Sequence, residues 1–274
     1  MSEGRIVARD LRKEFRVHTR PPGAWAALKS VYSRPTRVVK AVDGITFSIA
    51  RGERVGFLGP NGAGKTTTMR MLTGFLPPTD GSARICGHDI FEDPLAARRS
   101  IGYLPEMPPL YPEMTVASYV DYVARIKDVA RKERRAKVEH ALERCGLADV
   151  SRRVIGTLSK GYRQRVGLAQ AIVHEPPVLI LDEPTVGLDP IQIGEIRQLI
   201  ADLASGDGAT QHTVILSTHI LPEVEAICRR VVMINEGRKT VDAPLADLVR
   251  GGHRLEELFV RQVVGAAEPS EVGA

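Results

Sequence analysis

The stretch GPNGAGKT, from Gly59 to Thr66, combines residue types that can hold a chain of phosphates. It fits the pattern G-x-x-x-x-G-K-S/T and lies between an apolar run, RVGFL, and a helix-forming run, KTTTMRML. Glycines let backbone N–H groups surround a β-phosphate, Lys65 can reach the β- and γ-phosphates, and the Thr66 hydroxyl can ligate Mg²⁺. A chance match is rare in a chain of this length, so a glycine-rich turn without a ligand is the weaker interpretation. The stretch predicts a nucleotide site.

Two acidic residues, Asp182 and Glu183, follow a second apolar run, VLIL at 178–181. Open α/β sheets bind their ligands at the carboxyl ends of the strands, where these carboxylates are expected to lie. Asp182 would hold Mg²⁺, directly or through water, and Glu183 would be the general base toward an attacking water. After a third run, TVILST, His219 would contact the γ-phosphate and position that water. The weaker alternatives are an acidic pair that only caps a strand and a histidine of the core or surface.

The stretch LSKGYRQR has the composition of a helix N-terminus. Ser159 is a favourable N-cap, Gly161 follows it, and the first two turns are basic and rich in amides. The free N–H groups and the positive dipole end of such a helix can bind an anion. The residues alone leave open which anion that is, because the phosphate-binding stretch lies far earlier in the chain.

Alternating strand and helix patterns are expected to position these residues. IVARDLRKEF and ITFSIARGERVGFLG predict strands, and GKTTTMRMLTG predicts a helix with Gly74 at its C-terminal end. VLILDE and TVILSTH are continuous apolar runs, typical of strands buried on both faces of a parallel sheet. VVMINEGRKTVDA predicts a hairpin with its turn near 235–237. Because the stretch from about 89 to 156 is rich in helix formers, the sequence favours an α/β sheet domain with a helical insertion.

Composition restricts the class of protein. The 274 residues can bury one substantial core, and contents of 43% hydrophobic and 26% charged residues are ordinary for a soluble globular protein. No apolar run approaches the roughly 18 to 20 residues that span a bilayer, and the charged N-terminal stretch does not resemble a secretory signal. Cys86, Cys145 and Cys228 lack metal-binding spacing and indicate reduced thiols in a cytoplasmic setting. The net charge of +5 permits a phosphate-bearing partner without requiring one.

Five motifs, GPNGAGKTT, LSKGYRQR, VLILDEPT, GLDP and STH, occur in the order and rough spacing of an ATP-binding cassette (ABC) ATPase domain. The chain resembles this family over residues 3–240, and within it the separately encoded ATPase subunits of ABC-2-type exporters. GYLPE, LSKGYRQR and GLDP are most similar to the gliding-motility-type subgroup. The resemblance implies a P-loop NTPase (RecA-like) core with an antiparallel β subdomain and a helical ABC-specific insertion. It implies an ABC ATPase domain at 1–240, with the helical subdomain at about 89–165, and a C-terminal extension at 241–274.

The resemblance also implies roles for the residues that match the family's motifs. Catalysis would involve Lys65, Glu183 and His219, and the metal ligands would be Thr66, Asp182 and Glu106. ATP would be bound by Phe15, Gly59, Pro60, Asn61, Gly62, Ala63, Gly64, Lys65, Thr66, Thr67, Ser159, Gly161 and Asp189. In this family two ATPase domains pack head to tail, and each LSGGQ-type signature caps the γ-phosphate on the other chain's P-loop. Ser159 and Gly161 would therefore contact the partner's ATP, and Asp189 would couple the two sites.

Two motifs depart from the family's pattern. The signature has Lys160 and Tyr162 where a glycine and a glutamine are usual, but it retains the contact positions Ser159 and Gly161. Lys160 adds positive charge near a bound triphosphate, which is chemically compatible with binding. In YLPE, Glu106 replaces the glutamine that ligates Mg²⁺ and senses the transmembrane partner. A carboxylate still ligates a hard cation but adds negative charge near the γ-phosphate, so we expect slower or more metal-dependent turnover.

The adenine end of the expected site depends on Phe15, in LRKEF. The family stacks the base on an aromatic residue that ends the first strand, and Phe15 matches that position. The alternative is a phenylalanine of the hydrophobic core.

A segment at 16–37 interrupts the pattern of strands and is bracketed by prolines. Apolar and aromatic residues recur in it at helical spacing between basic residues: Trp25, Leu28, Val31 and Tyr32. The segment predicts either a basic amphipathic turn on a membrane surface or partner helix, or an insertion packed on its own sheet.

Two segments nearer the C-terminus have less specific patterns. The basic run at 131–137 predicts a solvated helix face, with a binding patch as the weaker alternative. The amphipathic stretch at 255–264 predicts a short helix that docks back on the domain, with a frayed tail after Pro269.

The resemblance implies an ATPase subunit, without membrane spans of its own, that powers a separately encoded polytopic membrane permease. Its cofactors would be ATP and Mg²⁺, and its partner would be a second ABC ATPase subunit, most simply an identical one. It would be peripheral to the cytoplasmic face of the cell membrane, with the permease docked around Glu106 to Met114, and it would not bind nucleic acid. ATP would close the dimer, and in-line attack by water on the γ-phosphate would reopen it.

Two other classes of protein are alternatives. A soluble ABC ATPase that acts on nucleic acid or ribosomes usually carries two cassettes and a long linker, or a coiled-coil insertion. This sequence has one cassette and no heptads. A non-hydrolysing regulatory sensor would bind nucleotide without turnover, and the presence of Glu183 and His219 argues against that class.

Overall fold

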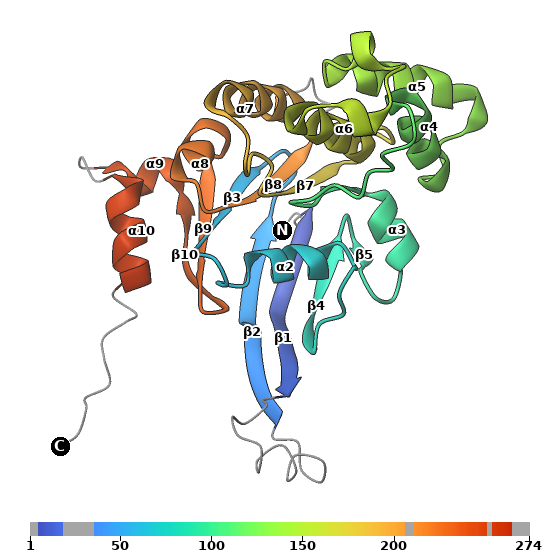
Figure 1. Ribbon diagram of the computed structural model, residues 1–274. Helices are drawn as coiled ribbons and strands as arrows, with labels where there is room; N and C mark the ends of the chain where they lie inside the picture. Colours follow the sequence, from blue (N-terminus) through green and yellow to red (C-terminus); the bar gives the residue numbers. More distant parts are fainter. Residues whose placement is uncertain (1–4, 19–35, 206–210, 251–253, 265–274) are drawn as a thin grey trace, which may run out of the picture.

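The computed structural model describes residues 5–18, 36–205, 211–250 and 254–264. Within these residues the chain forms a six-stranded sheet and a four-stranded sheet, with helices around them (Figure 1). This mixed architecture confirms the predicted α/β class.

The six-stranded sheet has the strand order β10-β9-β3-β8-β7-β6. Its strands are β3 (Arg54–Leu58), β6 (Ile101–Leu104), β7 (Val178–Asp182), β8 (Thr213–Thr218), β9 (Arg230–Asn235) and β10 (Arg238–Pro244). All neighbouring pairs are parallel except the edge strand β10, which is antiparallel to β9. These two strands form the predicted hairpin, and Glu236 and Gly237 in its turn both have positive φ. Every residue of β7 and β8 is buried, as their apolar runs predict.

The four-stranded sheet is antiparallel and has the order β2-β1-β4-β5. Its strands are β1 (Ile6–His18), β2 (Thr36–Ile49), β4 (Asp80–Ile85) and β5 (His88–Asp89). This sheet is the antiparallel β part of the predicted fold. The strands β1 and β2 extend into both ends of the segment at 16–37, whereas its central part, with the four apolar and aromatic residues singled out above, lies outside the described residues.

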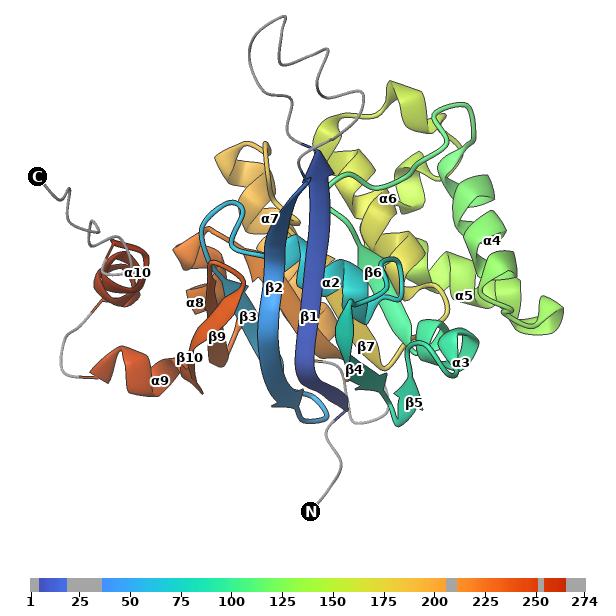
Figure 2. The same cartoon turned by 90° about the horizontal axis from the view of Figure 1, so that it is seen from below.

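Two hydrophobic clusters lie on opposite faces of the six-stranded sheet. Along β7, Leu179 and Leu181 belong to one cluster and Val178 and Ile180 to the other, because successive side chains of a strand point to opposite faces. The second cluster is shared with the four-stranded sheet and with α2 (Lys65–Leu72), which contacts strands of both sheets. Figure 2 shows α2 alongside the long β1–β2 pair. The helix that starts at the phosphate-binding stretch is therefore held between two layers.

Helices cover the other face of the six-stranded sheet. They are α4 (Val116–Ile126), α5 (Arg131–Arg144), α6 (Lys160–Ile172), α7 (Pro190–Ala204) and α8 (Leu221–Ile227), with 3₁₀ turns at Ala148–Val150 and Ile155–Thr157; the short helix α3 (Pro94–Arg99) instead places Ala97 in the second cluster. The helix α3 contacts β5 and β6 at the side of the sheet, and α4 to α8 supply residues to the first cluster. The range 89–165, expected to be a helical subdomain, also contains β6, which belongs to the central sheet, and α6 continues beyond it. Four residues, IGYL, are too short to reveal a strand by periodicity.

The C-terminal extension contains α9 (Leu245–Leu248) and α10 (Leu255–Val264). Leu255 is fully buried in the first cluster, and Leu258 and Phe259 pack against it. The structure thus has a helix at Leu255–Val264 whose apolar residues pack on the domain. The predicted frayed tail lies outside the described residues.

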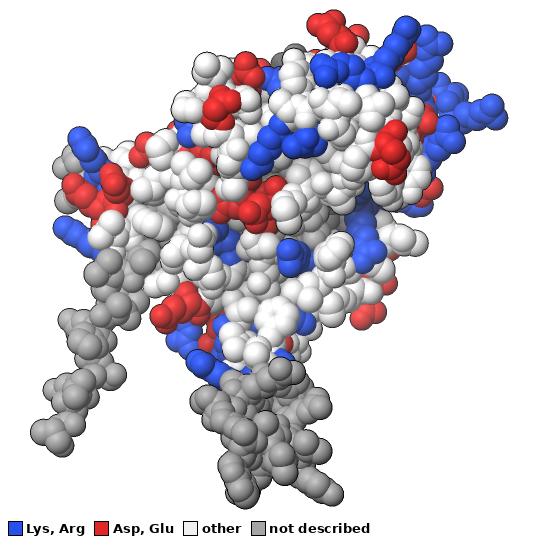
Figure 3. Space-filling view, viewed as in Figure 1, with Lys and Arg blue, Asp and Glu red and all other residues white. Residues whose placement is uncertain are grey.

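The basic run at 131–137 lies on α5 and contributes to the blue area at the upper right of Figure 3. The side chains of Lys132 and Arg135 are 83% and 91% exposed. Ion pairs with Glu133 and Glu139 on the same helix accompany them. The predicted solvated helix face is confirmed.

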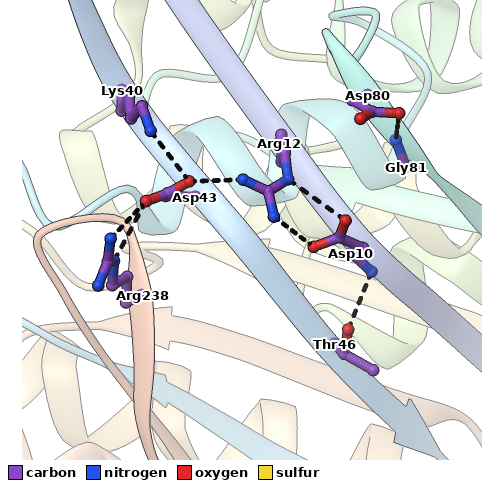
Figure 4. A network of polar contacts seen from close by, with 8 residues as sticks. All are labelled: Asp10, Arg12, Lys40, Asp43, Thr46, Asp80, Gly81 and Arg238. Atoms are coloured by element: carbon purple, nitrogen blue, oxygen red, sulfur yellow. Dashed lines mark hydrogen bonds and ion pairs between the residues drawn. The ribbon is translucent and has the colours of Figure 1, made fainter.

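Asp43 on β2 connects the four-stranded sheet to the β9–β10 hairpin (Figure 4). Its carboxylate accepts hydrogen bonds from Arg12 Nη1 on β1 at 2.9 Å and from Arg238 Nη2 on β10 at 2.8 Å. Its backbone N–H donates to the Gly237 carbonyl at 2.8 Å. The hydrogen bond from Arg238, together with the positive charge of Lys40 and Arg12, lowers the pKa of Asp43.

The network around Asp43 predicts a pH-dependent part of the stability. A carboxyl whose pKa is lower in the folded than in the unfolded chain stabilises the fold at pH values above its unfolded pKa, which is about 3.9 for Asp. This stabilisation is lost as the pH falls through the pKa of the folded state. Asp43→Asn should therefore unfold at a lower temperature than wild type at pH 7, and the difference should shrink below about pH 4. Thermal melts from pH 7 to pH 3 measure this, with the exposed Asp149→Asn as control. A difference that is independent of pH contradicts the assignment.

Gly102 on β6 lies against the end of α6. An added Cβ would sit 2.1 Å from the carbonyl oxygen of Ala171, a backbone atom that cannot move aside. We expect Gly102→Ala to lower the free energy of unfolding by about 2 kcal/mol or more. The matched control is Gly194→Ala on α7, where an added Cβ meets no described atom within 4 Å. This substitution should raise the free energy of unfolding by about 0.5–1 kcal/mol. Denaturant titration without nucleotide measures both, and shifts of the same sign would contradict this packing argument.

Candidate nucleotide-binding site

The phosphate-binding stretch forms the turn between β3 and α2, as predicted. An added Cβ on Gly59 would lie 2.2 Å from the carbonyl oxygen of Ile234, and one on Gly64 would lie 2.3 Å from that of Ala41. Gly64 also has a φ of 103°, and Gly62 has a φ of 80°, both in the region that favours glycine. These contacts and dihedral angles favour glycine at these places, and the N–H groups at the start of α2 can face an anion.

Lys65 is the first residue of α2 and is 95% buried. Its ammonium donates hydrogen bonds to the carbonyls of Gly59 at 2.7 Å and Pro60 at 3.2 Å. The same nitrogen lies 3.7 Å from Glu183 Oε1. Burial lowers the pKa of Lys65, and the nearby carboxylates of Glu183 and Asp182 oppose that shift. The loop thus holds a cation against its own backbone, where an incoming phosphate can replace the carbonyl contacts.

Asp182 ends β7 beside the start of α2. Its Oδ1 accepts a hydrogen bond from the Thr66 hydroxyl at 3.3 Å, whereas its Oδ2 is buried and has no hydrogen-bond partner. Burial raises the pKa of Asp182, and the Thr66 hydrogen bond is among the contacts that oppose this. A buried acceptor without a donor is unfavourable unless a cation or water satisfies it. Thr66 and Asp182 therefore fit Mg²⁺.

The described residues contain no group of three or more His, Cys, Asp and Glu side chains arranged to hold a metal by themselves. Mg²⁺ in nucleotide sites is commonly held by one or two protein ligands together with substrate phosphates and water, and Thr66 and Asp182 would be those ligands here. The donors present fit a cation that enters with its nucleotide.

Glu183 follows Asp182 and has a φ of 49°, an unusual value for a residue with a side chain. Its Oε1 lies 2.9 Å from His219 Nδ1, and its Oε2 lies 3.3 Å from the Thr218 hydroxyl. The carboxylate is 8% exposed and the imidazole 41% exposed. The strand ends thus place a buried carboxylate behind an accessible histidine, an arrangement that can orient and deprotonate a water.

A cavity of about 270 Å³ brings most of the predicted site together. Its walls include the loop residues Asn61 to Thr67, together with Glu106, Glu183 and His219. Glu106 comes from the segment after β6 and faces the same space as Lys65, so the position that departs from the family pattern lies at the phosphate site. Ala41 and Val186 complete the lining.

The predicted signature residues lie in a different cavity, of about 500 Å³. Ser159 caps α6 and accepts a hydrogen bond from the Tyr162 N–H at 3.3 Å, as expected of an N-cap. Asp189 caps α7 and accepts from the Gln192 N–H at 2.9 Å. Ser159, Gly161 and Asp189 all line this second cavity. Within one chain, the structure therefore does not bring them to the P-loop.

Phe15 lies inside β1 and is 38% exposed, so it is not a core residue. The ammonium of Lys13 lies 5.4 Å from the centre of its ring. Phe15 is not among the described residues that line the phosphate cavity. Stacking of adenine on this ring stays a prediction.

Three residues next to Glu183 were not predicted from the sequence: Thr185, Thr218 and Glu223. Glu223 is fully buried, and burial raises its pKa. Its position four residues after His219 on a short helix is the only sequence signal for it, and that signal is weak without knowledge of where α8 folds.

Comparison with known proteins gives the class to which this site belongs. The family described as ABC transporter matches residues 42–186, more than half of the chain. The chain belongs to the ABC transporter ATPase family. As a member of this family, the chain binds ATP and couples its hydrolysis to transport. The family resemblance seen in the sequence is confirmed. The narrower likeness to the gliding-motility-type subgroup stays a prediction.

Two relatives and one solved structure show the extent of the similarity. The bacitracin transport ATP-binding protein BcrA of Bacillus licheniformis is 38% identical over 218 residues, which cover 80% of this ABC ATPase and 69% of BcrA. The ABC transporter ATP-binding protein NatA of Bacillus subtilis (strain 168) is 37% identical over 223 residues, which cover 81% of this chain and 89% of NatA. A solved ATP-binding subunit of an ABC transporter aligns with a TM-score of 0.74 and 28% identity, covering 93% of this chain and 98% of the other.

None of the helices in the described part of this ABC ATPase combines the length and the apolar character of a membrane span.

Proposed function

We propose that this chain binds Mg²⁺-ATP in the phosphate cavity and hydrolyses it as one half of a head-to-tail dimer. The dimer drives a separately encoded ABC-2-type exporter at the cytoplasmic face of the cell membrane. One observation supports the proposal: the residues expected to bind ATP line two separate cavities of the chain. One contains Lys65, Glu183 and His219, and the other contains the anion-binding helix start at Ser159.

The phosphate cavity supplies the parts that γ-phosphate hydrolysis needs. The loop N–H groups and Lys65 bind the phosphates, and Thr66 and Asp182 hold Mg²⁺, which spreads the charge that develops on the phosphoryl oxygens. Glu183 accepts the proton of the attacking water, and His219 orients that water toward the γ-phosphate. Glu106 adds a carboxylate on the same wall and increases the demand for a bound cation.

The second half-site completes the cage only across two chains. The N-terminus of α6 presents free N–H groups and the positive end of its dipole, and Ser159 adds a hydroxyl. A second copy that packs head to tail brings this helix start onto the ATP of the first, and Asp189 then lies at the same junction. Donors that are already oriented stabilise the transition-state charge without reorganising.

Subunit mixing tests this arrangement. Lys65→Ala removes the phosphate-binding ammonium, and Ser159→Asp keeps the N-cap but puts a negative charge against the γ-phosphate. Each variant alone should be nearly inactive, while a mixture should recover hydrolysis, because one composite site then pairs an intact P-loop with an intact signature. A chain that carries both substitutions, mixed with Lys65→Ala, is the control and should recover nothing. No recovery in the first mixture contradicts the shared site.

The segment after Glu106 suits a permease. Met107 is 83% exposed, and Tyr111 and Tyr122 are exposed aromatic residues whose ring centres lie 5.7 Å apart. These exposed apolar side chains offer an amphipathic helix a place to dock, and Glu106, which lines the phosphate cavity and precedes Met107, would connect that place to the nucleotide. Co-purification with a separately encoded polytopic membrane protein distinguishes this role from a nucleic-acid or sensor role.

A further inference from the structure

The hydroxyl of Thr218 lies between two buried carboxylates. It is 2.9 Å from Glu223 Oε2 and 3.3 Å from Glu183 Oε2, while the Ile220 N–H donates to it at 3.1 Å. A hydroxyl has one proton to donate. Thr218 can therefore donate a hydrogen bond to Glu223 or to Glu183, but not to both, and the shorter distance favours Glu223.

Glu223 holds this position from α8. Its carboxylate is fully buried, and its two oxygens accept the hydroxyls of Thr185 and Thr218. The charged groups that act on it are Glu183 and His219 from the site and Arg197 from α7. It does not line the phosphate cavity, so it acts on the site only through its partners.

Thr185 connects Glu223 to the loop between the two cavities. It is 1% exposed and precedes Val186, which lines the phosphate cavity. The same loop continues to Asp189, which lines the signature cavity. Through two hydroxyls, one carboxylate thus connects the general base to the segment that would couple the two half-sites.

We propose that Glu223 is a positioning residue for hydrolysis. Glu223 accepts the hydrogen bond that the Thr218 hydroxyl donates, so that Glu183 Oε2 stays free to accept a proton from water. Its hydrogen bond from Thr185 also fixes the loop that leads to Asp189. The inference rests on the proposed function, in which Glu183 is the general base.

Glu223→Gln tests the inference with almost no change in shape. The glutamine amide has only one oxygen to accept hydrogen bonds, where the carboxylate had one for each threonine hydroxyl. Thr218 can donate to the charged Glu183 instead, so we expect the amide oxygen to accept the hydrogen bond from Thr185. Thr218 then donates to Glu183 and occupies the oxygen needed by water. The single-turnover hydrolysis rate at saturating ATP should fall about tenfold, with the KM for ATP within about twofold of wild type. Glu225→Gln, an exposed residue of the same helix, should match wild type.

Rescue by a second substitution separates this role from a structural one. Thr218→Val removes the competing proton, so Glu223→Gln combined with Thr218→Val should be faster than Glu223→Gln alone and within about threefold of Thr218→Val. If the two losses add instead, or if Glu223→Gln is as active as Glu225→Gln, the inference is wrong.

Two controls make every outcome decisive. If Glu223→Gln does not fold, Glu223→Asp is the second variant: it keeps the charge but draws the carboxylate back from both hydroxyls, so the inference expects slower single-turnover hydrolysis with the KM for ATP kept, and hydrolysis at the wild-type rate overturns it. Glu183→Gln distinguishes the two levels of the argument. Full activity in Glu183→Gln overturns the proposed function, whereas its inactivity together with an unaffected Glu223→Gln overturns only the role of Glu223.

Discussion

Glu183→Gln is expected to lower the rate of ATP hydrolysis by about 10²- to 10⁴-fold while ATP binding is kept. The amide has nearly the shape of the carboxylate and can keep contacts with His219 and Thr218, but it cannot accept a proton from water. Removing the charge also weakens the attraction on Lys65, which lies 3.7 Å from Glu183 Oε1 in the wild-type chain. ATP should therefore bind at least as tightly as before, and the ATP-bound dimer should accumulate.

Three measurements decide this prediction: single-turnover hydrolysis, equilibrium binding of ATP, and size-exclusion chromatography with ATP. Glu225→Gln makes the same chemical change at an exposed position on α8 and should behave as wild type in all three. Hydrolysis by Glu183→Gln within about tenfold of wild type would mean that another group is the base. Loss of ATP binding would mean that Glu183 has a structural role in the loop.

Lys65→Ala is expected to weaken ATP binding at least about 100-fold, because in the proposed function the ammonium donates charge-assisted hydrogen bonds to two phosphates. The effect on the free energy of unfolding, measured without nucleotide, should be small by comparison. Lys65 donates to the carbonyls of Gly59 and Pro60, and burial lowers its pKa, so this site favours the cation less than water does. We therefore expect Lys65 to serve a ligand more than the fold.

Equilibrium titration with ATP and a denaturant titration without nucleotide measure the two effects separately. Lys132→Ala, on the exposed face of α5, removes the same charge and should change neither. If Lys65→Ala bound ATP normally, the cavity would not be the nucleotide site. If it unfolded at much lower denaturant without nucleotide, Lys65 would be a structural residue.

The sequence alone predicted those parts of the protein that depend on local conformation. The P-loop is one, because the glycines at 59, 62 and 64 are the residues that its backbone path allows. The strands β7 and β8 are another, because continuous apolar runs are stable only when both faces are covered. The N-cap at Ser159 and the turn at Glu236 and Gly237 likewise follow from a few neighbouring residues.

Element boundaries were less predictable. The strand β6 lies inside a range expected to be helical, because IGYL carries no period and its strand conformation comes from pairing with β7. The first two strands continue into a segment expected to be an insertion, because each supplies the other with hydrogen bonds. Such pairings form between residues distant in the chain, which local propensity does not register.

Motifs and their spacing along the chain predicted Lys65, Asp182, Glu183 and His219 as site residues. How these residues lie relative to one another was decided only by the tertiary structure. The parallel order of β3, β8 and β7 brings three strand ends to one edge, so residues more than a hundred positions apart share a cavity with Glu106. The fold also places Glu223 beneath Thr218 and keeps Ser159 away from its own P-loop. Motifs record what each short segment can do; distances between segments are set by sheet order and by burial of the shared core, which no single segment contains.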